Sequence, residues 1–85
     1  MQPIATAAIR SAFAAVGVNV RVRHFGAKAR ICRCDMQPFD RAQADRVTAG
    51  LGMTNAAGQP GGQINQAHEV FAYYPGAIVR ARIAA

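Results

Sequence analysis

One stretch of the chain, VNVRVRHFGAKARICRC over residues 18–34, restricts the possible folds most strongly because apolar and cationic residues alternate along it. A period of two is typical of a strand with one buried face. Gly26-Ala27 at the centre suits a two-residue type II′ turn, since glycine tolerates a positive φ at the first central position. The stretch therefore predicts a β-hairpin. The turn sets its register: Phe25 with Lys28, Arg23 with Arg30, Val22 with Ile31, and Arg21 with Cys32.

A helix is predicted before this hairpin, over residues 3–16. Pro3 can occupy the first helical turn, and Gly17 can end the helix. The apolar residues of its buried face recur at helical spacing: Ile4, Ile9, Phe13 and Val16.

A second helix is predicted after the hairpin, beginning at Pro38 or Asp40 and ending near Leu51. Arg41 and Asp45 are four residues apart and are expected to form an ion pair on its solvent side. Its buried side is expected to hold Phe39, Val47 and Leu51.

The last third of the chain predicts a loop and a second hairpin. Residues 55–66 are rich in Gly, Pro and amide side chains, which indicates a mobile loop. Pro75-Gly76 fits the centre of a type II turn. This turn would pair Tyr74 with Ala77, Phe71 with Arg80, and Glu69 with Arg82. The order α-β-β-α-β-β predicts one α+β domain over residues 1–85, with two layers: a four-stranded antiparallel sheet and two helices on one face.

Composition narrows the classes of partner. Ten Lys and Arg against four Asp and Glu give a formal net charge of +6, which favours nucleic acid, an acidic protein face or an anionic membrane. A basic charge also keeps a small protein soluble. No stretch approaches the roughly 20 apolar residues that a membrane span needs. Two cysteines separated by one residue do not form a secreted disulfide framework, so we expect a reducing, cytoplasmic compartment.

The face of the sheet opposite the helices is the candidate functional surface. Arginines bind phosphates with two parallel hydrogen bonds, and aromatic rings on a sheet stack with bases. Arg23 opposite Arg30 is unfavourable unless an anion lies between them. Two alternatives remain: an ordinary solvated face, and a homodimer joined through the sheet. The predicted partner-binding residues are Arg21, Arg23, Phe25, Lys28, Arg30, Phe71, Tyr73, Arg80 and Arg82.

Metal binding and catalysis are poorly supported. Cys32 and Cys34 would point to the same side of a strand about 7 Å apart. Zinc needs more ligands, and His24 is predicted to lie on the other face. Neither His24 nor His68 has an evident nucleophile or carboxylate partner, so we expect no enzyme activity and no cofactor.

The run AIRSAFAAVGVNVRVRHFGAKARICRCD, residues 8–35, resembles small helix-hairpin domains of phages and other mobile elements, among them domains attached to large polyvalent proteins. Stand-alone proteins of that kind are often inhibitors of host defence, including anti-CRISPR proteins. The resemblance implies a non-enzymatic inhibitor in the bacterial cytoplasm that binds a host protein or nucleoprotein complex with an acidic surface. The alternative is a small module that binds DNA or RNA directly. Either protein would be a monomer or a homodimer.

Overall fold

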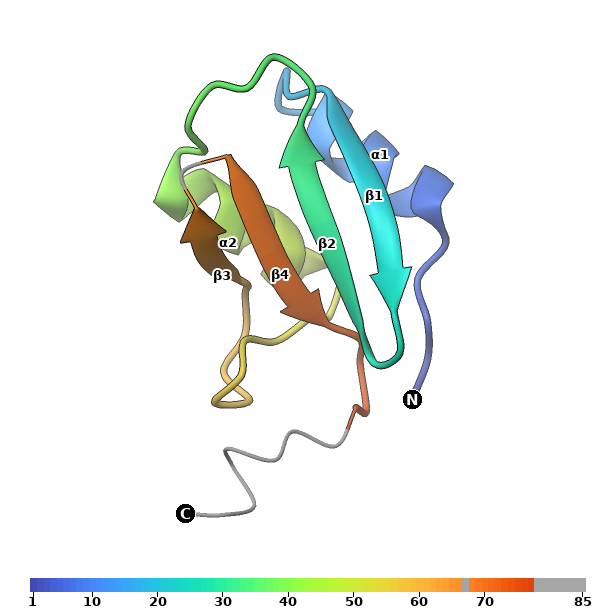
Figure 1. Cartoon of the computed structure of the whole chain (residues 1–85). Helices are drawn as coiled ribbons and strands as arrows, with labels where there is room; N and C mark the ends of the chain where they lie inside the picture. Colours follow the sequence, from blue (N-terminus) through green and yellow to red (C-terminus); the bar gives the residue numbers. More distant parts are fainter. Residues whose placement is uncertain (67, 78–85) are drawn as a thin grey trace.

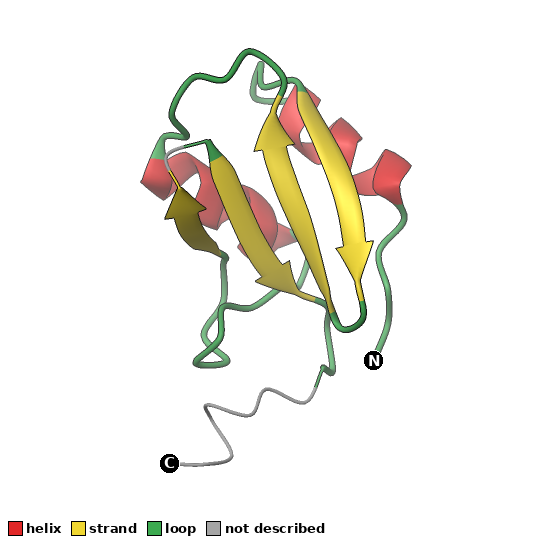
Figure 2. Cartoon of the chain, in the orientation of Figure 1, coloured by secondary structure: helices red, strands yellow, loops and turns green. Residues whose placement is uncertain are grey.

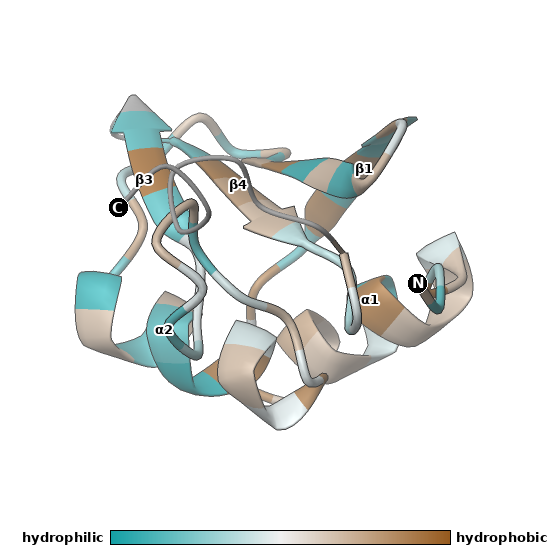
Figure 3. Cartoon of the chain, turned by 90° about the horizontal axis from the view of Figure 1, so that it is seen from below, coloured by the Kyte–Doolittle hydropathy of each residue, from teal (hydrophilic) through white to brown (hydrophobic). Residues whose placement is uncertain are grey.

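The chain folds into two layers, an antiparallel sheet and a pair of helices, as Figure 1 and Figure 2 show. This computed structural model describes residues 1–66 and 68–77. Its sheet has the strand order β1-β2-β4-β3. The elements are α1 (Thr6–Ala14), β1 (Val20–Phe25), β2 (Lys28–Arg33), α2 (Arg41–Gly50), β3 (Gln63–Gln66) and β4 (Glu69–Tyr73). Both helices lie on one side of the sheet, with the opposite face directed away from them (Figure 3). The predicted α+β class and layer arrangement are confirmed.

The first hairpin has the predicted register, with Val22 opposite Ile31 and Arg23 opposite Arg30. Gly26 has a φ of 55°, whereas Ala27 does not have a positive φ, which is the sign pattern of a type II′ turn. Val20 and Ile31 are buried on the helix side, so the turn and the hydrophobic pattern select the same register.

Helix α1 is shorter than predicted at both ends. Ile9 and Phe13 are buried as expected, but Val16 lies beyond the last helical residue and is 42% exposed. The chain turns there because Gly17 adopts a φ of 80° and the amide of Val18 donates to the carbonyl of Phe13. The expectation that Val16 belongs to the buried helical face is therefore wrong.

Helix α2 begins after Asp40, whose carboxylate accepts a hydrogen bond from the amide of Gln43 at 3.0 Å. Phe39 packs edge-on against Phe13 with ring centroids 5.7 Å apart, which joins the two helices. In α2 the fully buried residues are Ala44 and Thr48. The two residues predicted for its buried side, Val47 and Leu51, are only partly buried. The sequence pattern missed Ala44 and Thr48 because neither is a large apolar side chain.

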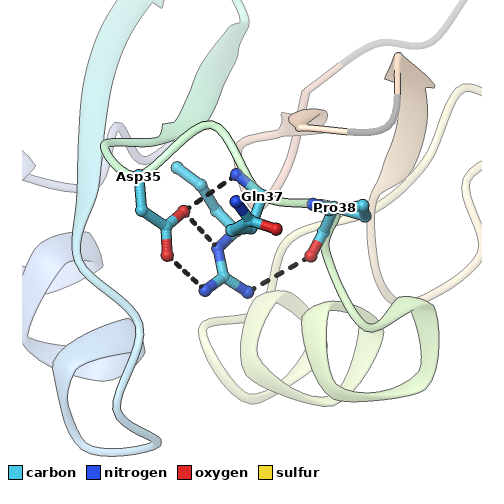
Figure 4. A network of polar contacts seen from close by, with 4 residues as sticks. Asp35, Gln37 and Pro38 are labelled. Carbon is cyan, nitrogen blue, oxygen red and sulfur yellow. Dashed lines mark hydrogen bonds and ion pairs between the residues drawn. The ribbon is translucent and has the colours of Figure 1, made fainter.

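The connection from β2 to α2 is held by one arginine (Figure 4). Arg33 donates to both carboxylate oxygens of Asp35, from Nε at 2.9 Å and from Nη2 at 2.7 Å, and Nη1 donates to the carbonyl of Pro38. The amide of Gln37 also donates to Asp35. The hydrogen bonds from Arg33, and then that from Gln37, lower the pKa of the Asp35 carboxyl.

Among the described residues, the strand that completes the sheet beside β4 is β3, Gln63–Gln66. This strand lies within the segment that the sequence predicted as a loop. Ile64 is the only apolar residue in β3, so the sequence carries no strand pattern there. The close approach of Gly62 to β4 permits the pairing: a Cβ at Gly62 would lie 2.7 Å from Cγ1 of Val70. The predicted strand after Pro75-Gly76 lies outside the described residues from position 78 onward.

The rest of the predicted mobile loop is also hydrogen-bonded. The side-chain oxygen of Asn55 accepts from the amides of Ala57 and Gln59, which closes a tight turn. Thr54 exchanges two backbone hydrogen bonds with Tyr73 at the end of β4. Met53, which precedes this turn, is fully buried in the core. The loop therefore continues the packed structure beyond α2.

The turn at Pro75-Gly76 is confirmed. Gly76 has a φ of 77°, and the amide of Ala77 donates to the carbonyl of Tyr74 at 3.1 Å, as a type II turn requires. The amide of Gln2 donates to the carbonyl of Pro75, so the first residues of the chain pack against this turn. Within the described residues, no helix is both long and apolar enough to cross a bilayer.

Candidate anion-binding site

The open face is the side of the sheet turned away from the helices, and it combines cationic and aromatic side chains. Alternation along the paired strands assigns residues to it, since Val20, Ile31, Val70 and Ala72 are buried on the other side. Seven of the nine predicted partner-binding residues lie on the open face: Arg21, Arg23, Phe25, Lys28, Arg30, Phe71 and Tyr73. The remaining two, Arg80 and Arg82, lie outside the described residues.

An ion pair lies at the centre of the open face. Arg30 Nε lies 2.6 Å from Oε2 of Glu69, whose side chain is 10% exposed. Glu69 was expected to pair with Arg82, which is outside the described residues; the observed partner is Arg30 because β2 and β4 are neighbours. The thiol of Cys32 donates to the same carboxylate oxygen at 3.6 Å. The neighbouring Cys32, and then electrostatic attraction by Glu69, raise the pKa of the Arg30 guanidinium.

The Arg30–Glu69 contact leaves one donor unused. The Nε N–H of Arg30 is buried, yet it is not directed at Glu69 and has no hydrogen-bond partner among the described residues. The contact is therefore an ion pair without a hydrogen bond through this atom.

Two further arginines extend from the outer strand β1. Arg21 and Arg23 are exposed and point to the same side, two residues apart. In the described part of the chain, neither has a carboxylate partner. Together with Arg30 and Cys32 they line a hollow of about 260 Å³. Like charges opposite each other destabilise a strand pair, and Arg23 faces Arg30 directly, so an anion in this hollow would relieve repulsion.

A second hollow lies beside the first, over β4 and β3. Its volume is about 180 Å³, and its walls include the rings of Phe71 and Tyr73. The ammonium group of Lys28 lies over both rings, 5.1 Å from the centroid of Phe71 and 5.6 Å from that of Tyr73. Two amide side chains complete the rim, Gln63 and Asn65. Sequence reasoning missed these two because it placed them in a loop rather than on β3.

The two cysteines lie in different surroundings. Cys32 is buried and Cys34 is exposed beyond the end of β2. Among residues 1–66 and 68–77, no three His, Cys, Asp or Glu side chains lie close enough together to hold a metal ion.

The two histidines differ in environment. His24 lies on the helix side, as predicted, where its ring hydrogen-bonds to the hydroxyl of Thr6 at 2.7 Å and to the hydroxyl of Tyr74. Burial raises the pKa of the Tyr74 hydroxyl. These contacts tie α1 to the end of the sheet and account for His24 structurally. The carbonyl of His68 accepts from the amide of Arg33.

The expected Arg41–Asp45 ion pair is not formed. Asp45 instead accepts a hydrogen bond from the amide of Gly62 at 3.4 Å, which connects α2 to the start of β3. The sequence does not reveal this competing backbone donor, because Asp45 and Gly62 are 17 positions apart.

Comparison of the chain with protein-family models, with curated proteins and with solved structures gives no match. The functional conclusion therefore depends on the residues of the open face and on their geometry.

Proposed function

We propose that this protein is a non-enzymatic phage or mobile-element protein that inhibits a host defence nucleoprotein complex, in the manner of an anti-CRISPR protein, by binding it stoichiometrically through the open face. The observation that carries the proposal is the pair of exposed cations, Arg21 and Arg23, with no carboxylate partner in the described part of the chain. Two like charges beside a third, Arg30, favour an anionic partner.

The apolar part of the open face supports recognition of a macromolecule. Phe25 is 44% exposed at the tip of the first hairpin, and the partly buried rings of Phe71 and Tyr73 lie farther along the same face. Aromatic residues and arginines are the side chains that most often dominate the binding energy of protein interfaces. A small inhibitor that docks once on a large complex needs anchors of this kind rather than a deep cleft.

The alternative function is direct binding of DNA or RNA, with no dependence on a defence complex. Cations beside aromatic rings on a sheet are the means by which several single-strand binders hold a strand. This alternative predicts affinity for naked nucleic acid that falls steeply with salt, because bound counterions are released.

An infection assay tests the proposed function. A panel of bacterial strains would each express one type of CRISPR–Cas system directed against a phage, with and without this protein. We expect plaques to return in the strain whose complex is the target. With the purified complex of that strain, inhibition should be complete at about one protein per binding site.

Charge reversal on two faces provides the matched comparison. Arg21→Glu with Arg23→Glu should abolish inhibition, whereas Arg10→Glu with Arg46→Glu on the exposed surfaces of α1 and α2 should not. Each replacement changes the charge by two units, so both double variants fall from +6 to +2. Inhibition that survives reversal of Arg21 and Arg23, or that appears in no strain of the panel, would contradict the proposal.

A further inference from the structure

The two hollows of the open face lie side by side and differ in chemistry. One row of paired residues crosses both of them: Arg23 on β1 faces Arg30 on β2, which faces Phe71 on β4. Neighbouring strands are about 4.8 Å apart, so the cationic hollow and the aromatic hollow are separated by one or two strand spacings. A ligand with an anionic group next to a flat ring could occupy both.

The first hollow has the chemistry of an oxyanion site. Guanidinium groups suit phosphate because their N–H donors match two oxygens at once. Glu69 offsets one of the three charges, that of Arg30, and fixes this side chain in place. Two exposed cations remain without a carboxylate partner among the described residues, Arg21 and Arg23. A volume of about 260 Å³ is large enough to hold a phosphate group.

The second hollow has the chemistry of a base site. The rings of Phe71 and Tyr73 provide surfaces for stacking, and the amides of Gln63 and Asn65 on β3 can donate to and accept from base edges. Lys28 now covers the ring faces. When a base stacks there, the flexible Lys28 side chain can swing to the neighbouring phosphate.

These features distinguish a nucleic acid from an acidic protein segment. Carboxylates would satisfy the arginines, but they would make no use of the stacking rings and the two rim amides. We propose that the two hollows together bind one nucleotide of a single-stranded nucleic acid, with its backbone phosphate beside Arg21, Arg23 and Arg30 and its base against Phe71 and Tyr73. This inference deepens the proposed function and rests on it for its biological setting: the part of the defence complex that is contacted would be an unpaired strand.

Fluorescence anisotropy with three labelled probes tests the inference: a mixed-sequence single strand, an abasic strand of equal length, and poly-glutamate of equal charge. We expect the protein to bind the base-bearing strand at physiological salt, about tenfold more tightly than the abasic strand, which is the order of effect that one stacked base gives. Equal affinity for all three probes, or no binding to the base-bearing strand, would overturn the inference.

Substitutions in each hollow test which one binds the base and which one binds the phosphate. Phe71→Leu should weaken binding to the base-bearing strand about tenfold and leave the abasic strand unaffected. Arg21→Gln with Arg23→Gln should weaken binding to both strands. The slope of the logarithm of the binding constant against the logarithm of the salt concentration should become shallower by roughly 0.7 for each phosphate that the variant no longer neutralises. Arg10→Gln with Arg46→Gln is the charge-matched control, and circular dichroism confirms that each variant is folded. A Phe71→Leu variant that is folded and binds both strands like the parent protein would remove the base site.

The infection assay and the binding assay can contradict the two proposals separately. Inhibition that depends on Arg21 and Arg23 without any binding to strands would leave the proposed function intact and overturn the nucleotide site. Strand binding that depends on the same residues, without inhibition in any strain, would support the nucleotide site and overturn the proposed function.

Discussion

At Glu69, a carboxylate is almost buried in the sheet directly beneath cationic side chains. Glu69 as a whole residue is only 7% exposed because it lies on β4, the strand between β2 and β3. Burial of a charge is costly unless a partner compensates it, and Arg30 and Cys32 supply the partners. Glu69 therefore sets the position of the central arginine and reduces the charge of the first hollow.

Glu69→Gln keeps the shape of the side chain and removes its charge. We expect the free energy of unfolding to fall by about 1–2 kcal/mol, less than for a fully buried pair because the Arg30 side chain is 37% exposed and partly solvated. Urea unfolding of Glu69→Gln, Arg30→Gln and the double variant gives the coupling energy between the two residues, which we expect to be favourable.

The matched cycle uses Arg23→Gln, which removes a cation that faces Arg30 but forms no ion pair with Glu69. Arg23→Gln alone should leave stability unchanged or raise it slightly, because it relieves like-charge repulsion. Coupling of Glu69 with Arg23 as large as with Arg30 would show that the effect is diffuse and not a specific pair.

At the scale of elements, the position of β3 depends on a glycine. Gly62 precedes β3, and a Cβ there would lie 2.7 Å from Cγ1 of Val70 and 3.2 Å from the carbonyl oxygen of Phe71. Neither contact can be relieved by moving the end of a flexible side chain, because both atoms belong to or lie close to the backbone of β4. Gly62→Ala must therefore push β3 away from β4.

We expect Gly62→Ala to lower the free energy of unfolding by about 1–3 kcal/mol, the usual cost of forcing an extra methyl group into a packed site. Gly50→Ala is the control, since a Cβ at Gly50 meets nothing within 4 Å and the residue ends α2. That change should stabilise the protein by about 0.5–1 kcal/mol. Equal effects of the two substitutions in thermal or urea unfolding would contradict the packing explanation.

The elements that the sequence predicted well are those specified by local signals. The first hairpin has a turn glycine and strict alternation, so its residue pairing was predicted correctly. Helix α2 has Asp40 as its N-cap, so its start was predicted correctly. Strand β3 has one apolar residue and depends on Gly62 and β4, which are tertiary features. The same limit applies to the site: alternation assigned residues to the open face, whereas the Arg30–Glu69 pair required knowledge of strand order.

At the scale of the whole molecule, charge is unequally distributed between the two layers. The sheet has Arg21, Arg23, Lys28 and Arg30 on its free face, with Glu69 as the one described acid among them. The helical layer mixes both signs, since Asp40 and Asp45 accompany its arginines. The long-range field of the described part therefore directs anions toward the sheet.

This asymmetry argues against a homodimer joined through the open face, because two copies would bring the same arginines together. We expect a monomer in reductant at physiological salt, measured by size-exclusion chromatography with light scattering. Without reductant, a disulfide-linked dimer should form through the exposed Cys34. Cys34→Ser should abolish that dimer on a non-reducing gel, whereas Cys32→Ser should not, because Cys32 is buried. A dimer that persists in reductant and dissociates in the Arg21→Glu, Arg23→Glu variant would instead identify the open face as a contact between copies.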